Sequence, residues 1–367
     1  MKIFKRYILP ALIWAAITGY VVCAAQLART RQANSVVRSV EIEIADSTAD
    51  RRLVTNRMVR EWLLNGGVNT IGVPVREVDF TGIEKLITRN GFVDKAVAYA
   101  ATDGAMYIKV SQRQPAVRFM TDGYDLYATH EGFVFGTPAA STVYVPVITG
   151  GYRPPFPPRY EGSARSHTDS LIYGSGGIAE RIAEIDRQYA ETEKQAARLK
   201  ARYQSERRSK LRKRSFEKDE SYKRRKADFD ADKQVVLRRI DGERRETRAE
   251  LQRMEVRRGE LCAMIKKEEK KYEDFLKLLN FVEQIEDDDF WRSEIVQIIV
   301  DTTPGGALAV ELVPRSGAFT IEFGEPDDVQ GKLDKLMRFY RHGLQNIGWD
   351  RYSSINIACE GQVICRK

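Results

Sequence analysis

The chain has 367 residues, of which 43% are hydrophobic and 10% aromatic, enough for two or three domains with packed cores and too many for a wholly disordered chain. The net charge of +8 is local, because residues 178–271 contain 30 basic and 20 acidic residues whereas the rest of the chain contains 30 and 32. This distribution excludes a uniformly basic nucleic-acid-binding protein and indicates a near-neutral protein with one basic segment.

A basic head and an uncharged stretch open the chain. Residues 1–6 contain three basic residues, and residues 7–25 contain no charged residue. A helix of this length nearly matches the ~30 Å hydrocarbon core, so the stretch predicts a membrane-spanning helix with a cytoplasmic N-terminus. A cleaved signal peptide is the alternative, because Val22-Cys23-Ala24 resembles a cleavage site. The residues expected to anchor the chain are Tyr7, Ile8, Leu12, Trp14, Ile17, Val21 and Val22.

A small α/β unit is predicted next. Alternating apolar and polar residues over 36–44 predict a strand, and helical spacing over 53–64 and from Thr81 predicts two helices. The alternating runs 93–101 and 105–110 flank an Asp-Gly pair, which is a strong signal for a β-hairpin. The predicted order is therefore strand, helix, helix, strand, strand.

Short strands separated by glycine-containing turns then predict a mixed antiparallel β domain in two parts. The first part follows residue 113 and ends near residue 150, and the second resumes at residue 294. In the second part, Asp327 is expected to cap a helix that reaches His342. The predicted strands of the second part are 294–300, 308–313, 319–323, 354–359 and 362–366.

Residues 177–281, which lie between these two parts, are highly charged and lack proline. Apolar residues recur at spacings of four and three over 178–203 and again over 237–282, a pattern typical of a coiled coil. Because both ends must join one β domain, we expect an antiparallel helical hairpin that reverses within residues 205–233. An intermolecular coiled coil is the alternative, because charged residues interrupt the apolar positions of the second pattern. The basic surplus of residues 178–271 fits either a solvated helix surface or contact with anionic lipid head groups, wall polymers or an acidic partner.

The sequence contains no recognisable catalytic or metal-binding motif. Its four cysteines form no CxxC pair, and its three histidines have no Cys or Glu at ligand spacing. It also lacks a nucleophile elbow, a zinc-protease motif and a phosphate-binding glycine loop. We therefore expect no enzymatic activity, metal or cofactor, and we expect Cys359 and Cys365 to lie out of register rather than in a disulfide.

Together these features resemble the FtsQ/DivIB family of bacterial cell-division proteins. The unit of residues 37–110 resembles a POTRA domain, and the segment that begins at Arg113 stands where the family joins this domain to its β domain. Asn356 replaces the aspartate that is usual in the family. The matching segments are Arg113-Gln114-Pro115-Ala116-Val117, residues 127–135, Val145-Pro146-Val147-Ile148-Thr149-Gly150, Phe323-Gly324, Lys332-Leu333 and Ile355-Asn356-Ile357.

The resemblance implies a single-span scaffold of the cytoplasmic membrane, enriched at the division septum, with most of the chain in the periplasm. Such a protein links early and late division proteins and binds partners resembling FtsB, FtsL, FtsW and FtsK, and we expect no nucleic acid. Its last strand would hold the FtsB–FtsL pair at a free edge, although an ordinary edge strand protected by terminal charges is the alternative. The residues expected at this edge are Ala358, Cys359, Glu360, Gly361, Gln362, Val363, Ile364 and Cys365, and Arg113 and Pro115 are expected at the interdomain joint.

The expected fold class is α+β: a transmembrane helix, a POTRA-like β-α-α-β-β domain, and a mixed antiparallel β domain interrupted by an antiparallel coiled-coil hairpin. An alternative function is a POTRA-containing envelope transport or assembly factor, which would carry tandem POTRA units that the sequence does not show. The expected segments are 1–35 for the head and anchor, 36–112 for the POTRA-like domain, 113–160 and 284–367 for the two parts of the β domain, and 161–283 for the linker and insertion.

Overall fold

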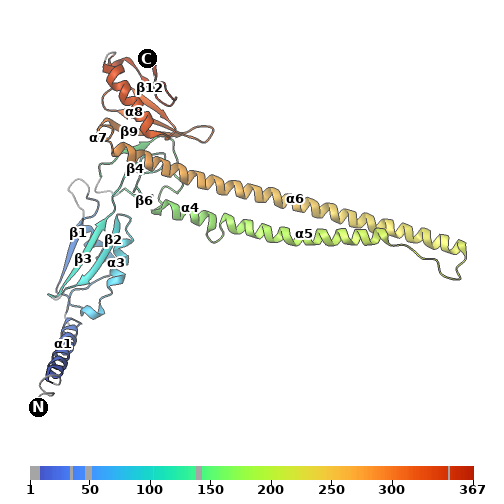
Figure 1. Ribbon diagram of the computed structural model, residues 1–367, viewed down its shortest axis with the longest axis horizontal. Coiled ribbons are helices and arrows are strands. Elements are labelled where there is room, and N and C mark those ends of the chain that lie inside the picture. The colour runs from blue at the N-terminus through green and yellow to red at the C-terminus, as the bar shows by residue number, and fades with distance from the viewer. Residues whose placement is uncertain (1–8, 34–35, 46–51, 102, 138–142, 346–347) are drawn as a thin grey trace. The chain divides into compact units, whose positions relative to one another are not determined.

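The structure is a computed structural model of the chain, and it describes residues 9–33, 36–45, 52–101, 103–137, 143–345 and 348–367. Its architecture is α+β, as the sequence predicts (Figure 1). The chain forms two compact units. The first comprises Met1–Arg153, Pro157–Ser163 and Lys277–Lys367, and the second comprises Pro154–Phe156 and Ala164–Leu276.

Helix α1 (Leu9–Ala33) lies where the sequence predicts a membrane-spanning helix, and that prediction is wrong. Within the described residues, no helix combines the length and the hydrophobicity that crossing a bilayer requires. Thr18, Gly19 and Tyr20 interrupt the apolar residues of α1, and arginines follow in its last turns. Of the residues predicted to anchor the chain, Tyr7 and Ile8 lie outside the described residues, Leu12 lies within α1, and Trp14, Ile17, Val21 and Val22 are exposed on it.

A three-stranded sheet and two helices form the POTRA-like domain. The strand order is β1-β3-β2, with β1 parallel and β2 antiparallel to β3, and the element order confirms the sequence prediction. Thr55 and Asp79 cap the two helices by accepting hydrogen bonds from Met58 N (3.3 Å) and Gly82 N (2.9 Å). The elements are β1 (Ser39–Ala45), α2 (Asn56–Asn65), the 3₁₀ turn η3 (Val75–Glu77), α3 (Phe80–Thr88), β2 (Val93–Ala100) and β3 (Ala105–Gln112).

The β domain is built on one ten-stranded sheet of the order β13-β12-β11-β10-β9-β7-β4-β5-β6-β8. Its strands are β4 (Val117–Phe119), β5 (Leu126–Ala128), β6 (Phe133–Gly136), β7 (Val147–Thr149), β8 (Gly162–Ser163), β9 (Ile295–Thr302), β10 (Leu308–Pro314), β11 (Thr320–Gly324), β12 (Ser354–Asn356) and β13 (Ile364–Arg366). Its helical elements are α7 (Asp289–Glu294), α8 (Val329–Phe339), the π-helical turn η4 (Tyr340–Leu344) and the 3₁₀ turn η5 (Trp349–Arg351).

The two parts of the β domain join through the parallel pairing of β7 with β9, which aligns Ile148 with Ile298. Beside this pair, Gly151 N donates a hydrogen bond to Asp301 Oδ1 at 2.6 Å, across 150 residues of sequence. Gly150 has a φ of 103°, and a Cβ at this position would lie 2.4 Å from the Val300 carbonyl oxygen. The residue at position 150 must therefore be glycine for the two parts to meet.

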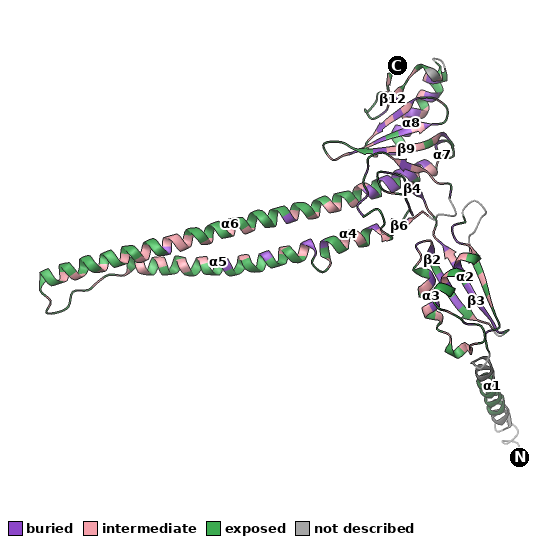
Figure 2. Cartoon of the chain, turned by 180° about the vertical axis from the view of Figure 1, so that it is seen from behind, coloured by how far each residue is buried: buried purple, intermediate pink, exposed green. Residues whose placement is uncertain are grey.

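The second unit contains α4 (Ala164–Tyr173), α5 (Ile178–Arg208) and most of α6 (Asp219–Glu286), which continues into the first unit from residue 277. Helices α5 and α6 form a hairpin whose loop, residues 209–218, lies within the range in which the sequence predicts a reversal (Figure 1). Figure 2 shows that most of its surface is exposed. The residues that pack between the two helices are Ile178, Ile182, Ile185, Met254, Leu261 and Ile265.

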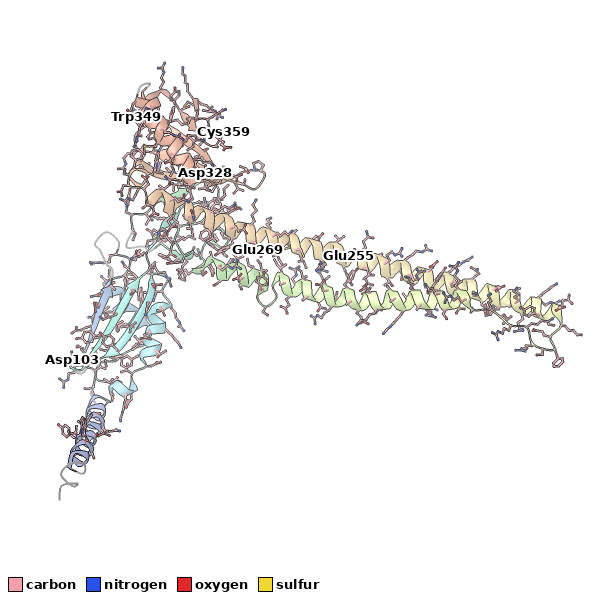
Figure 3. All side chains as sticks on the ribbon, in the orientation of Figure 1. Asp103, Glu255, Glu269, Asp328, Trp349 and Cys359 are labelled. Atoms are coloured by element: carbon pink, nitrogen blue, oxygen red, sulfur yellow. The ribbon has the colours of Figure 1, made fainter. Side chains whose placement is uncertain are left out.

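Polar contacts fix the register of this hairpin. Tyr189 Oη donates a hydrogen bond to Glu255 Oε1 (2.9 Å), and Arg258 Nε pairs with Asp186 Oδ1 (2.8 Å). Glu255 is marked on α6 in Figure 3. These contacts establish an antiparallel helix pair, while the coiled-coil geometry inferred from the heptads stays a prediction. The sequence did not predict α4, which lies in the expected linker.

Two local predictions near the C-terminus are wrong. Asp328, with a φ of 41°, occupies the N-cap of α8, because the neighbouring carboxylate of Asp327 binds Lys332 instead. The last two strands are three residues each, shorter than predicted. Lys335 Nζ donates hydrogen bonds to the carbonyl oxygens of Ile357 (2.7 Å) and Cys359 (2.5 Å), so these groups bind a side chain rather than a neighbouring strand.

Candidate functional site: the C-terminal edge of the β sheet

Strand β13 lies at one end of the ten-stranded sheet. Within the described residues, β12 is the only strand that pairs with it, in an antiparallel register that aligns Ile355 with Cys365. An end strand leaves one row of backbone N–H and C=O groups without a partner strand. Ile364 is 44% exposed, so this edge also presents an apolar side chain to solvent.

Strand β11 holds the edge in place through Glu322. Its carboxylate accepts hydrogen bonds from Asn356 Nδ2 (2.5 Å) on β12 and from Arg366 Nη1 (3.2 Å) on β13. The Ser353 N–H also donates to the Arg366 carbonyl oxygen at 2.9 Å. One carboxylate therefore fixes the last two strands against the rest of the sheet, which keeps a short edge strand in register.

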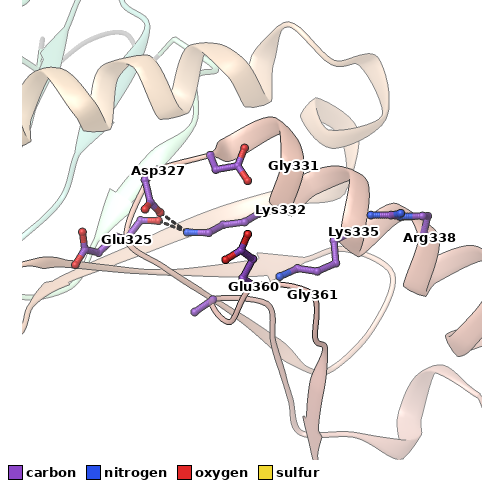
Figure 4. A pocket seen from close by; sticks show the side chains of 10 residues that line it. Glu325, Asp327, Gly331, Lys332, Lys335, Arg338, Glu360 and Gly361 are labelled. Carbon is purple, nitrogen blue, oxygen red and sulfur yellow. Dashed lines mark hydrogen bonds and ion pairs between the residues drawn. The ribbon is translucent and has the colours of Figure 1, made fainter.

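A groove of about 620 Å³ lies between α8 and the turn that leads into β13 (Figure 4). The residues that line it are Glu325, Asp327, Asp328, Gly331, Lys332, Lys335, Arg338, Ala358, Glu360 and Gly361. Basic side chains come from α8, and Glu360 faces them from the turn (Figure 4). Gly361 has a φ of 68°, a left-handed conformation that the turn requires.

Two of the groove lysines stabilise its walls. Lys332 is 9% exposed, binds Asp327, donates to the Glu325 carbonyl oxygen (2.8 Å) and lies 5.0 Å from the ring centroid of Phe323. Lys335 holds the β12–β13 connection through the two carbonyl contacts described above. The walls of the groove are thus held together by hydrogen bonds from charged side chains.

Lowering the pH below about 4 is expected to weaken the contact of Asp327 with Lys332. The hydrogen bond from Lys332 lowers the pKa of Asp327 below its usual value, so the contact stabilises the fold above the unfolded pKa and is lost as the pH falls through the folded pKa. The carboxyl side chain is 71% exposed, so the effect should stay under about 1 kcal/mol. Urea unfolding of the wild type and of Asp327→Asn at about pH 7 and about pH 3 measures it. A stability difference that is equal at the two pH values would contradict this assignment.

The structure divides the predicted edge residues between a turn and a strand. Ile364 and Cys365 lie in β13, whereas the stretch from residue 358 to residue 363 lies in the connection. Within that connection, Ala358, Glu360 and Gly361 line the groove. Cys359 and Cys365 are both free thiols, and Cys359 is marked beside the C-terminal strands in Figure 3.

The predicted interdomain joint is a packed contact. The Arg113 guanidinium carbon lies 3.5 Å from the ring centroid of Phe133, and Nη1 is 3.0 Å from Asp94 Oδ1. The Arg113 N–H donates to the Phe92 carbonyl oxygen at 2.8 Å, and burial lowers the pKa of Arg113. Pro115 lies in the link between β3 and β4. This arginine therefore contacts both the POTRA-like domain and the β domain.

Sequence reasoning missed Lys335, Arg338 and Glu322 as residues of the site. A signal was present, because Lys332, Lys335 and Arg338 recur every three residues on the polar face of a predicted helix. What this face contacts depends on the β12–β13 connection, which a helical pattern alone does not place. Within the described ranges, no three His, Cys, Asp or Glu side chains gather as a metal site.

Comparisons with known families match two separate stretches of the chain. A family model for a POTRA-like domain matches residues 35–111, and a model described as FtsQ/DivIB, C-terminal related, matches residues 253–366. No curated protein matches the chain. FtsQ/DivIB is a family of non-enzymatic cell-division scaffolds. A POTRA-like domain followed by an FtsQ/DivIB-related C-terminal region identifies the chain as an FtsQ/DivIB-type protein.

Proposed function

We propose that this protein is a septal, membrane-associated scaffold that links early and late division proteins and captures a pair of partners resembling FtsB and FtsL at strand β13. The observation that carries the proposal is the end position of β13 in the sheet. The FtsQ/DivIB match supports a role in division. Contacts with partners resembling FtsW and FtsK would fall on other surfaces of the same scaffold.

Strand addition explains how so short an edge could bind a partner. A partner strand laid along β13 would satisfy the outer row of backbone groups, and those main-chain hydrogen bonds supply affinity. Side chains select the partner: Ile364 is exposed beside the edge, and the neighbouring groove offers the charged residues Lys335, Arg338 and Glu360. Glu322 holds β12 and β13 in place beforehand, which reduces the entropy lost on binding.

Removing the edge tests the proposal. Deleting residues 362–367 from the full chain should abolish co-purification of co-expressed FtsB- and FtsL-like proteins from the same organism. Replacing only Ile364 by aspartate should weaken capture by at least about tenfold, because the variant places a charge where an apolar contact is expected. Thermal unfolding of Ile364→Asp should stay close to that of the wild type, since Ile364 packs little in the free protein.

Ile71→Asp provides the matched control. Ile71 is 61% exposed in the POTRA-like domain, so the same chemical change is made away from the C-terminal edge. This control should co-purify the partners as the wild type does. Capture that is unchanged in both the deletion and Ile364→Asp would overturn the assignment of β13 as the partner edge.

A further inference from the structure

The tip of the α5–α6 hairpin carries a dense positive charge. Residues 205–226 contain eleven basic and four acidic residues. Two of these acids are paired within the tip, Glu217 with Arg225 and Asp219 with Lys213. In contrast, the exposed side chains of Lys210, Arg212 and Lys218 form no salt bridge within the described residues. The outward charge of the tip is therefore strongly positive.

A single aromatic side chain projects from the same loop. Phe216 has a relative exposure of 102%, the largest among the large hydrophobic residues that the structure describes. It lies in a turn closed by two contacts: Glu217 N donates to the Arg214 carbonyl oxygen (3.2 Å), and Arg214 N donates to Glu217 Oε2 (3.1 Å). The turn thus directs the ring into solvent, where it contributes nothing to the folding of the hairpin.

The loop around Phe216 is well organised. Lys233 Nζ from α6 donates hydrogen bonds to the carbonyl oxygens of Arg207 (2.9 Å) and Ser209 (2.7 Å), which ties the end of α5 to α6. Arg225 binds both Glu217 and the Arg212 carbonyl oxygen (3.3 Å). The hydrogen bond from Arg225 lowers the pKa of Glu217 to about 2, so this pair stays charged at neutral pH. The exposed ring and its basic neighbours are therefore presented together.

We propose that this hairpin tip is a peripheral binding element for an anionic lipid bilayer. Basic residues near such a surface each contribute about 1 kcal/mol, which corresponds to about fivefold in affinity. Phe216 would insert its ring at the level of the head groups, as the apolar side chains of interfacial elements do. Lys210, Arg212 and Lys218 would contact lipid phosphates around it. The proposal adds a lipid contact that is independent of partner capture at β13.

The composition of the tip favours a lipid surface over nucleic acid. Sites for single strands stack successive bases on several aromatic side chains within a groove. Here Phe216 is alone at the apex, and Tyr222 Oη is turned back to donate to the Leu211 carbonyl oxygen at 3.4 Å. One exposed ring in a hairpin loop matches shallow insertion into a lipid interface better than it matches the stacking of a nucleic-acid strand.

Vesicle flotation and a trypsin footprint together test the proposal on the full chain. The vesicles are pure phosphatidylcholine or phosphatidylcholine containing phosphatidylglycerol. Cleavage after the many Lys and Arg residues of the loop reports contact at the tip itself, whichever other part of the chain meets the vesicle. Anionic vesicles should protect residues 207–218 of the wild type from trypsin, and pure phosphatidylcholine should not. Added salt should reduce this protection.

Three variants make the test specific. Replacing Lys210, Arg212 and Lys218 by glutamine should reduce affinity for anionic vesicles at least about tenfold. Phe216→Ser should reduce it roughly tenfold. The matched control replaces Arg253, Arg257 and Lys267 by glutamine; these residues are exposed on α6 away from the tip. It should bind anionic vesicles as the wild type does.

The opposite results would overturn the proposal. One such result is that neutral and anionic vesicles protect residues 207–218 from trypsin equally. The other is that both tip variants bind anionic vesicles with the affinity of the wild type. A single-stranded DNA oligonucleotide that protects the loop better than vesicles at equal phosphate concentration, in a Phe216-dependent manner, would reassign the tip to nucleic acid. Circular dichroism of each variant checks that the hairpin remains helical.

Discussion

Trp291→Ala is expected to lower the free energy of unfolding of the first unit by about 3–5 kcal/mol. Trp291 on α7 is 2% exposed, and its ring contacts those of Phe290 (4.9 Å between centroids) and Tyr340 (5.7 Å). Truncation removes a large buried ring and leaves a cavity that the surrounding sheet and helix cannot fill. Urea unfolding followed by circular dichroism measures the change.

Trp62→Ala is the matched control for this prediction. Trp62 lies on α2 of the POTRA-like domain and is only partly buried. Its truncation should cost clearly less than that of Trp291, because less apolar surface returns to water. Equal losses in the two variants would show that the aromatic cluster around Tyr340 is not the centre of stability that the structure indicates.

Glu294→Ala is expected to cost about 2–4 kcal/mol, because it leaves buried donors without an acceptor. Glu294 as a whole residue is 8% exposed. Its carboxylate accepts hydrogen bonds from the Ser316 hydroxyl, Ser316 N (3.3 Å) and Tyr340 Oη (3.3 Å). Burial, and then the charge of Glu294, raises the pKa of Tyr340, so this hydroxyl remains a donor at neutral pH.

Glu294→Gln separates the loss of charge from the loss of an acceptor. The amide oxygen can still accept one of these hydrogen bonds, so the glutamine variant should lose less stability than the alanine variant. Urea unfolding of both variants at neutral pH gives the comparison. A glutamine variant as unstable as the alanine variant would show that the negative charge itself, rather than the acceptor atom, stabilises this contact.

Both changes affect the part of the sheet that carries the candidate site. Trp291 and Glu294 belong to α7, immediately before β9, and Arg315 N at the end of β10 donates to the Glu294 carbonyl oxygen at 2.7 Å. These contacts hold the central strands on which β11, β12 and β13 are assembled in turn. Loss of this core should therefore disturb the strand that we propose as the partner edge.

The POTRA-like unit and the reversing hairpin were predictable because their signals are local. Alternation over a few residues, an Asp-Gly turn and helical spacing each depend on neighbours in sequence. The resemblance to FtsQ/DivIB also rested on short segments, and the family matches confirm it. The prediction of a membrane-spanning helix was wrong because the absence of charge is a weaker criterion for a membrane span than sustained hydrophobicity. Thr18, Gly19 and Tyr20 fall within the uncharged stretch and lower its hydrophobicity.

The candidate site was predictable only in part. The sequence indicated a terminal strand, but the groove beside it needs α8 to face the β12–β13 connection. Lys335 makes that contact across 22 and 24 residues of sequence, through carbonyl groups that carry no sequence signature. The two carbonyl groups that Lys335 binds belong to the predicted strand 354–359, of which only residues 354–356 form β12.

By itself, the sequence determined the local elements, the basic hairpin and the family resemblance, since each depends on residue patterns within short windows. Only the tertiary structure decided that β7 pairs with β9 across the insertion, that β13 ends the sheet and that Glu322 holds this end in place. Strand pairing depends on backbone groups that all residues share, so the partner of a strand is settled by the packing of the whole domain.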